Sequence, residues 1–186
     1  MARIVVSEFV SLDGVMEAPG GEPGYKHTGW VARFQDPEQI QYKLEETLAH
    51  QALLLGRTTY ESFASAWPFM GGEFGAKMNS MPKFVVSTTL DKAEWNNTTV
   101  LKGDAMTAVA KLKDEFEGNI LVTGSRTLVA ALMAHDLVDE FKLMVFPIVL
   151  GSGKRLFADT DDAMTLDLVN THALTNGAVE LKYRRP

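Results

Sequence analysis

Short apolar runs rich in β-branched residues recur along the chain and predict buried strands. They occupy residues 3–10, 52–55, 83–87, 99–101 and 120–122. A sixth run, residues 141–150, is longer and almost wholly apolar, so it predicts a central strand. Pro147 lacks an amide hydrogen and removes one ladder donor from this strand, which indicates a bulge or a local edge.

Between these runs the apolar residues fall at helical spacing. Asp36 and Pro37 form a favourable helix start, an N-cap followed by proline at the first position, and predict a helix over residues 37–50. Ile40, Leu44 and Leu48 would form its buried apolar face. The other predicted helices are a short one after Gly56 that Trp67-Pro68 closes, one over residues 74–81, one from Asp104 to about Phe116, and one over 126–135.

The chain ends in a predicted hairpin, because Asn176-Gly177 is a strong turn signal between the strand candidates 167–170 and 179–183. Strands that alternate with helices favour a parallel sheet with helices on both faces. The predicted fold class is therefore α/β, with three layers, a mostly parallel mixed central sheet and a C-terminal antiparallel hairpin. At 186 residues, with no linker or repeat that divides it, the chain is predicted to be one domain, 1–186.

Charge and composition exclude several classes of protein. The net charge of −6 and the pI of about 5.2, without a Lys/Arg-rich run, argue against nucleic-acid binding. The sequence contains no apolar run long enough to span a membrane, and its first residues do not resemble a signal peptide. The absence of cysteine excludes disulfides and thiolate metal sites and fits a cytoplasmic protein. His50, His135 and His172 are not spaced as a metal cluster, so no metal is expected.

Two strands lead into helices through glycine turns that carry an arginine and hydroxyl groups. These turns are Gly56-Arg57-Thr58-Thr59 and Gly124-Ser125-Arg126-Thr127. The first amides of a helix are unpaired and carry the positive end of its dipole, so each turn can bind a phosphate. The alternative is that such turns are common in α/β proteins and most hold no ligand.

Two further loops follow strand ends, where ligands of open α/β sheets collect. The basic loop 151–155 follows the strand 141–150, and Ser87-Thr88-Thr89 follows the strand at 83. The hydroxyls of this second loop either bind phosphate or cap a turn. Two helix starts suit the two phosphates of a pyrophosphate, and an arginine with hydroxyls suits an additional phosphate. A dinucleotide with a 2′-phosphate requires this set of binding groups. The G-x-G-x-x-G fingerprint is absent, so a Rossmann site is not predicted.

Several of these segments resemble known sequences. GRTTYES at 56–62 is similar to the Gly-Arg-x-Thr-x-Glu-Ser segment of dihydrofolate reductases, and KFVVSTT and ILVTGSRTLV resemble their later strand ends. SLDG near the start and PIVLGSGKRLF late in the chain resemble the C-terminal reductase domain of the bacterial bifunctional deaminase-reductase of riboflavin biosynthesis. The resemblance runs from residue 3 to residue 183. It implies a dihydrofolate reductase-like fold with NADPH in the cleft.

The resemblance also implies roles for individual residues. The residues expected to bind the cofactor are Leu12, Gly14, Gly56, Arg57, Thr58, Thr59, Ser87, Thr88, Gly124, Ser125, Arg126, Thr127 and Leu128. The chain departs from the pattern at Ser125, where dihydrofolate reductases often have a second glycine. It also lacks a match for their pterin-binding carboxylate, since Glu38, Glu45 and Glu46 on the first helix are all expected to face solvent.

Asp13, at the end of the first strand, is the candidate catalytic residue, as a proton source or as the group that orients a water. The alternative is an aspartate that stabilises the Asp13-Gly14 turn. His27, in the long loop that starts near Pro19, is a second and weaker candidate. Trp30 and Phe34 are expected either to line the substrate pocket or to join the core.

Together these observations predict an NADPH-dependent reductase that transfers hydride to a C=N or C=O group of a small pterin-like, pyrimidine-like or other heterocyclic substrate. An alternative is a non-catalytic NADP(H)-binding sensor or scaffold of the same fold, with its pocket closed by Trp30 or Phe34. A third is a cofactor-free interaction module. The resemblance further implies a homodimer, formed through the apolar strand 141–150, and a small molecule as the ligand.

Overall fold

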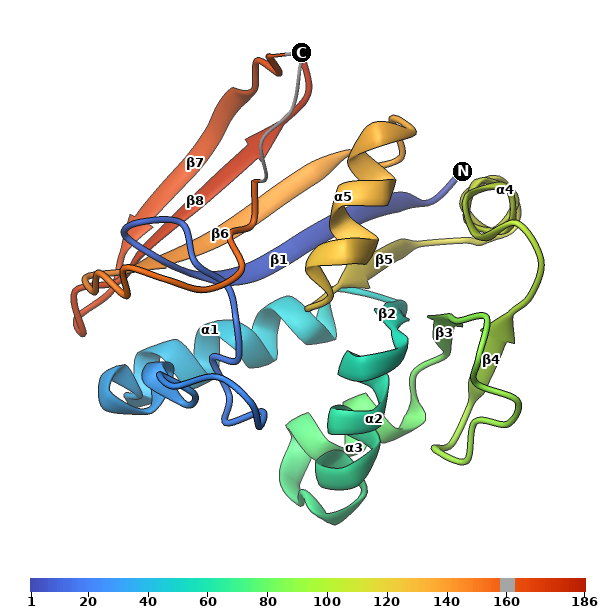
Figure 1. The fold of residues 1–186 in the computed structure, drawn as a ribbon, viewed down its shortest axis with the longest axis horizontal. Coiled ribbons are helices and arrows are strands. Elements are labelled where there is room, and N and C mark those ends of the chain that lie inside the picture. Colours follow the sequence, from blue (N-terminus) through green and yellow to red (C-terminus); the bar gives the residue numbers. More distant parts are fainter. Residues whose placement is uncertain (158–162) are drawn as a thin grey trace.

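The computed structural model of the chain, which describes residues 1–157 and 163–186, contains one eight-stranded sheet. Its order is β4-β3-β2-β5-β1-β6-β8-β7 (Figure 1), and all neighbours from β4 to β6 are parallel. β8 pairs antiparallel with both β6 and β7, as the predicted hairpin requires. The strands are β1 Arg3–Ser11, β2 Ala52–Gly56, β3 Lys83–Val86, β4 Thr98–Leu101, β5 Asn119–Val122, β6 Glu140–Phe146, β7 Asp167–Ala173 and β8 Val179–Arg184.

Helices cover both faces of this sheet, so the predicted three-layer α/β fold is confirmed (Figure 1). Side chains of α4 and α5 pack on one face, and those of α2 and α3 pack on the other, the side on which α1 lies. Among the described residues, no helix has the length and apolarity needed to span a bilayer. The helices are η1 Trp30–Phe34, α1 Pro37–Leu48, α2 Arg57–Ala66, η2 Trp67–Phe69, α3 Gly72–Ser80, α4 Ala105–Glu115 and α5 Arg126–Ala134.

Local sequence signals place the starts of α1 and α4 correctly. The carboxylate of Asp36 accepts a hydrogen bond of 2.8 Å from the Gln39 amide at the start of α1. Asp104 does the same for the Thr107 amide at the start of α4, also at 2.8 Å. Each bond satisfies one of the unpaired amides of the first helical turn, which is the reason that aspartate is favoured at this position.

The long apolar strand predicted over residues 141–150 is shorter than expected. β6 ends at Phe146 rather than at residue 150, because the chain turns at Pro147, where the Ile148 amide bonds to the Phe146 carbonyl at 2.8 Å. The following loop folds back along the segment after β1, and Leu12 N–H donates to the Ile148 carbonyl at 2.8 Å. β6 lies between β1 and β8, so a dimer through this strand would have to use one of its faces.

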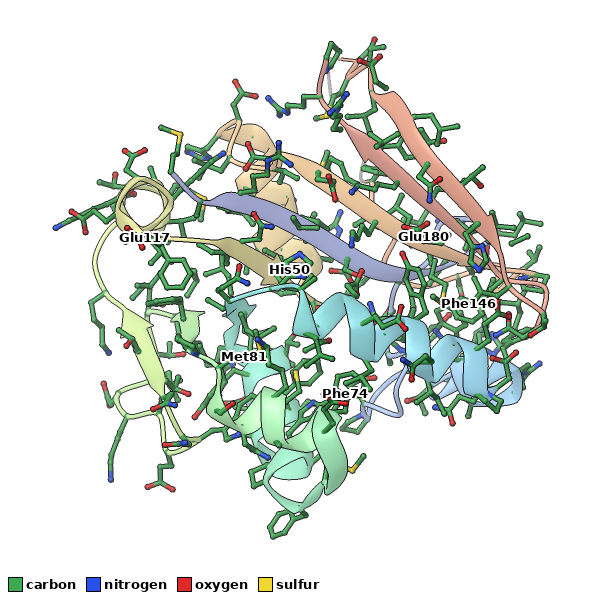
Figure 2. The ribbon with its side chains drawn as sticks, turned by 180° about the vertical axis from the view of Figure 1, so that it is seen from behind. His50, Phe74, Met81, Glu117, Phe146 and Glu180 are labelled. Carbon is green, nitrogen blue, oxygen red and sulfur yellow. The ribbon has the colours of Figure 1, made fainter. Side chains whose placement is uncertain are left out.

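The predicted buried face of α1 is wrong. Ile40 is 53% exposed and Leu48 is 38% exposed, whereas Gln39, Glu46 and Thr47 are buried. In Figure 2, which views the molecule from behind relative to Figure 1, α1 lies in front of the sheet, and the labelled residues His50 and Glu180 lie close to this helix. The helix packs through a polar face because the sheet opposite it supplies Ser7 and Lys142 as partners.

Candidate functional site

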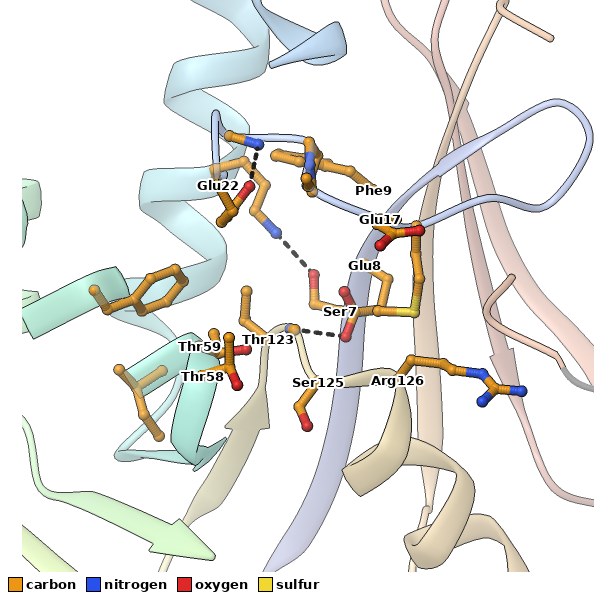
Figure 3. A pocket seen from close by; sticks show the side chains of 18 of the residues that line it. Ser7, Glu8, Phe9, Glu17, Glu22, Thr58, Thr59, Thr123, Ser125 and Arg126 are labelled. Atoms are coloured by element: carbon orange, nitrogen blue, oxygen red, sulfur yellow. Dashed lines mark hydrogen bonds between the residues drawn. The ribbon is translucent and has the colours of Figure 1, made fainter. Parts of the chain in front are cut away.

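A cavity lies at the point where the neighbouring strands β1 and β5 separate. β1 pairs with β5 only as far as Val6 and Val122, and then continues beside β6 to Ser11. The chain after β5 turns into α5, and the chain after β2 turns into α2. A cavity of about 510 Å³ occupies this position, within the range of small-molecule sites (Figure 3). This is the region beyond the strand carboxyl ends where the sequence predicted a ligand.

The two glycine turns meet at this cavity. A Cβ atom added to Gly56 would lie 2.3 Å from the Ser125 Oγ, and one added to Gly124 would lie 2.7 Å from the Thr59 Oγ1. Each turn therefore needs its glycine because the other turn passes too close for a side chain. The prediction that both helix starts share one groove is confirmed by Thr58, Thr59, Gly124, Ser125, Arg126 and Thr127, all of which line the cavity.

The start of α2 has no side-chain cap, because its N-cap residue is Gly56. Thr58 and Thr59 face the cavity, so their hydroxyls stand beside unpaired helix amides. Arg57 lies outside the cavity wall and forms a 3.2 Å ion pair with Glu61, in which both side chains are about half exposed. The half-exposed guanidinium uses one nitrogen in this ion pair and keeps other N–H donors for an anionic group.

The start of α5 is partly capped by the chain itself. Ser125 adopts the left-handed conformation at φ 65°, and its hydroxyl accepts a hydrogen bond from the Leu128 amide at 3.3 Å. The amide of Gly124, in the turn that the sequence predicted to hold a phosphate, donates instead to Glu8 Oε1 at 2.8 Å. The amides of Arg126 and Thr127 donate to no described residue, and these two remain for an anion. In Figure 3 the Arg126 side chain leads away from Thr58 and Thr59.

Glu8 is a cavity residue that the sequence reasoning missed. It is only 5% exposed and lines the cavity beside the turn that starts α5 (Figure 3). Burial raises the pKa of Glu8 to about 8, against the opposing effects of the Gly124 amide and Lys43, with a further upward effect from Glu46. The sequence offered one signal for this residue: Glu8 is the only glutamate within the apolar run of residues 3–10. The strand pattern alone does not distinguish a buried functional carboxyl from a polar interruption.

The wall toward α1 contains a charged cluster that was also missed. Lys43 lines the cavity and donates a 2.7 Å hydrogen bond to the Ser7 Oγ. Its ammonium group also pairs with Glu46, which in turn accepts from the Ser7 hydroxyl at 2.9 Å and lies 3.9 Å from Lys142. Burial pushes the pKa of Glu46 upward, but the two lysines and Ser7 more than offset it, so the pKa lies below its usual value. Glu46 was expected to face solvent, which is wrong.

Asp13 has the surroundings of a structural carboxylate. It accepts hydrogen bonds from the Ser11 hydroxyl at 2.6 Å, the Leu150 amide at 3.0 Å and the Gly151 amide at 2.8 Å. These bonds, first that of Ser11, lower the pKa of Asp13 to about 2, and the residue does not line the cavity. A general acid needs the opposite shift. The geometry thus supports the turn-stabilising alternative, because Asp13 ties the loop after β1 to the loop after β6.

The remaining predicted residues lie outside the cavity wall. Trp30 is 2% exposed and packs edge-on against Phe146 in the core, and Phe34 packs beside the same ring. The Ser87 hydroxyl accepts from the Leu90 amide at 2.9 Å and so caps a turn. The structure also places Leu12, Gly14, Gly56, Arg57, His27, Thr88 and Leu128 outside the lining, and their binding roles stay predictions. Within residues 1–157 and 163–186, no group of three or more metal-ligating side chains occurs.

The donor set fits a phosphorylated ligand. Two helix starts, free amides, hydroxyls and a glycine contact too close for any side chain define an α/β protein with a cleft beyond the carboxyl ends of its parallel strands. The sequence matches the RibD C-terminal domain family over residues 2–179, and the chain belongs to that family.

Individual proteins resemble this chain in sequence or in fold. The uncharacterised protein YyaP of Bacillus subtilis is 28% identical over 97% of this chain and 94% of its own. A Shewanella sp. PV-4 structure, provisionally named a riboflavin biosynthesis protein, has a TM-score of 0.76 at 23% identity and covers 100% of this chain and 99% of its own. The Thermotoga maritima diaminohydroxyphosphoribosylaminopyrimidine deaminase/5-amino-6-(5-phosphoribosylamino)uracil reductase has a TM-score of 0.66 at 13% identity, covering 100% of this chain and 57% of its own. These two structures share the fold.

Proposed function

We propose that the protein is an NADPH-dependent reductase of a small heterocyclic substrate. The observation that carries this proposal is the meeting of two helix starts at one cavity, through the contacts of Gly56 with Ser125 and of Gly124 with Thr59. A pyrophosphate bridging two helix amide groups requires that proximity. Membership of the RibD C-terminal domain family, with a named reductase among its structural neighbours, supports the same activity.

The residues of the chain would divide the work along the cleft. The amides of Arg126 and Thr127 and the hydroxyls of Thr58 and Thr59 would hold the pyrophosphate. Arg57, at the start of α2, would bind the 2′-phosphate in competition with Glu61 or through its remaining N–H donors. NADPH supplies the hydride when bound. The protein contributes orientation and exclusion of water, which are the two effects that speed hydride transfer between bound groups.

The part of the cavity between β1 and α1, which borders Glu8, would take the substrate. Its wall combines apolar side chains, Phe9, Met16 and Ile40, with the polar side chains of Gln39 and Lys43. Such a mixture suits a flat heterocycle that carries a few hydrogen-bonding groups. We therefore assign the substrate to pyrimidine-like or pterin-like compounds, or to small cyclic imines, with a C=N or C=O bond as the hydride acceptor.

The test has two steps that separate enzyme from binding protein. Calorimetric titration with NADPH comes first, with micromolar binding as the expected result, of order 8 kcal/mol. Oxidation of NADPH is then followed with 5-amino-6-(5-phosphoribosylamino)uracil, 7,8-dihydrofolate and 1-pyrroline. Binding without oxidation of any probe supports the alternative, a sensor or scaffold, although Trp30 and Phe34 do not close the cavity. Absence of binding contradicts both functions.

A further inference from the structure

We propose that Glu8 is the proton donor of the cleft: it holds a proton inside the cavity and passes it to the substrate atom that gains a hydrogen during reduction. This inference rests on the proposed reductase function and extends it, because a reduced C=N or C=O group needs a proton as well as a hydride. The role of proton donor is thus assigned to Glu8 on β1 in place of Asp13, which the sequence had suggested.

The first argument is the position of the carboxyl group. Glu8 Oε1 accepts the Gly124 amide at 2.8 Å, and Gly124 belongs to the turn that packs on Thr59 of the other helix start. The carboxyl is thus fixed at the junction of both helix starts, in the wall of the cavity. Its second oxygen, Oε2, forms no hydrogen bond with any described residue, so it is free to carry a hydrogen toward a ligand.

The second argument is the lack of a counter-ion. Two other buried carboxylates have lysine partners: Glu46 pairs with Lys43, and Glu140 lies 3.1 Å from Lys182. Glu180 is also buried and forms no ion pair with a described residue, but it does not line the cavity. No described basic side chain forms an ion pair with Glu8. A buried carboxyl without a cation favours its neutral form, and its pKa of about 8 means that it is mostly protonated near neutral pH.

Charged groups from every neighbouring element bear on this balance. The Gly124 amide and Lys43 favour the ionised form, and Glu46 opposes it. The other charged groups of the cavity wall are Glu17, Glu22, Arg126 and Lys154. A bound pyrophosphate would add negative charge beside the carboxyl and stabilise its proton further.

The proposed step balances. The substrate carbon accepts a hydride, with two electrons, from NADPH, and the π electron pair of its C=N or C=O bond moves to the nitrogen or oxygen. That atom takes the proton of Glu8, whose carboxylate is held by the Gly124 amide until it takes up a proton from bulk solvent after the products leave. The products are NADP⁺ and the reduced substrate, with Glu8 restored.

The test begins with a readout that needs no turnover. Infrared titration of the cofactor-free protein follows the band of the protonated Glu8 carboxyl, which is identified by its absence in Glu8→Gln. This band is expected to disappear as the pH rises, with a midpoint near pH 8. NADPH affinity is then measured at about pH 7 and about pH 9.5. The affinity of the wild type should fall severalfold at the higher pH, because the ionised Glu8 repels the phosphates. The affinity of Glu8→Gln should not fall, because its side chain stays neutral. A midpoint below about pH 6 would overturn the proposal.

Turnover supplies the second readout. With whichever of the three probes the wild type consumes, single-turnover hydride transfer by Glu8→Gln should drop at least about tenfold and lose its decline at alkaline pH. Glu45→Gln, on the exposed side of α1, is the matched control. Equal rates and pH profiles in wild type and Glu8→Gln contradict the proposal. If the wild type binds NADPH but reduces no probe, the donor role falls together with the reductase function, while the titration reports separately on the proton.

Discussion

The α-carbon of Gly124 lies against the side chain of Thr59, so closely that a methyl group on Gly124 would sit 2.7 Å from both Thr59 Oγ1 and Thr59 Cγ2. This contact joins the starts of α5 and α2 across the cleft. It also leaves the Gly124 amide directed at Glu8. One glycine therefore sets the spacing of the proposed phosphate site and the position of the proposed proton donor.

Gly124→Ala should lower the free energy of unfolding by at least about 2 kcal/mol, because it adds a clash with Thr59 to the strain of a positive φ. In a Thr59→Ala background the two clashing atoms are gone and only Cβ of residue 59, at 3.3 Å, remains close, so the same substitution should cost about 1 kcal/mol, mainly from the backbone. Urea unfolding of the four proteins measures this difference. Equal costs in both backgrounds would show that the Thr59 contact does not constrain the turn.

Arg57 and Glu61 allow a paired test of 2′-phosphate binding, since each side chain holds the other at 3.2 Å. Arg57→Gln should weaken NADPH binding about tenfold and leave NADH binding nearly unchanged, because NADH lacks the 2′-phosphate. Glu61→Gln releases Arg57 and should tighten NADPH binding slightly. Calorimetric titration of both variants with both cofactors makes the comparison; a loss of NADH affinity equal to the loss of NADPH affinity would place Arg57 elsewhere on the cofactor or outside the site.

The cluster around Glu46 predicts a large difference between two adjacent glutamates of α1. Glu46→Ala leaves Lys43 and Lys142 without their shared carboxylate, and it should destabilise the protein by on the order of 3 kcal/mol. Glu45→Ala, one residue earlier and exposed, should change stability by less than about 0.5 kcal/mol. Denaturant unfolding at neutral pH compares them. Similar effects of the two substitutions would mean that the buried cluster contributes little to stability.

The hydrogen bonds to Asp13 predict a pH-dependent contribution to stability. Its folded pKa of about 2 lies below the ordinary value of 3.8, so the ionised carboxylate stabilises the fold above about pH 4, and this contribution is lost as the pH falls through 4 toward 2. Asp13→Asn should therefore be less stable than the wild type at neutral pH, and the gap should narrow by about pH 3.

Unfolding curves at the two pH values test this prediction, with Asp91→Asn as the control because Asp91 is fully exposed. The control should change stability little at either pH. A gap between wild type and Asp13→Asn that stays constant from neutral to acidic pH would show that the loop bonds of Asp13 do not depend on its charge.

Much of the fold is readable from the chain because the signals are local. The caps at Asp36 and Asp104 act within three residues, and the Asn176-Gly177 turn acts within a hairpin. The order of strands and helices then places both glycine turns at the same edge of a parallel sheet, which is enough to predict the shared cleft. The limits of β6 were predicted less well, because Pro147 acts through the loop it begins rather than through the apolar pattern.

The roles of the charged residues required the tertiary structure. Glu8 and Gly124 are 116 positions apart in the sequence, and Asp13 and Leu150 are 137 positions apart. No periodicity in the sequence connects residues at such separations. Whether a carboxyl group is a stabilising anion or a proton reservoir depends on how much water the fold removes and which cations it brings near. The sequence by itself determined the elements, their order and the place of the cleft. Only the folded arrangement decided that Asp13 ties two loops together, that α1 buries a polar face, and that no described basic side chain forms an ion pair with Glu8 in the cavity wall.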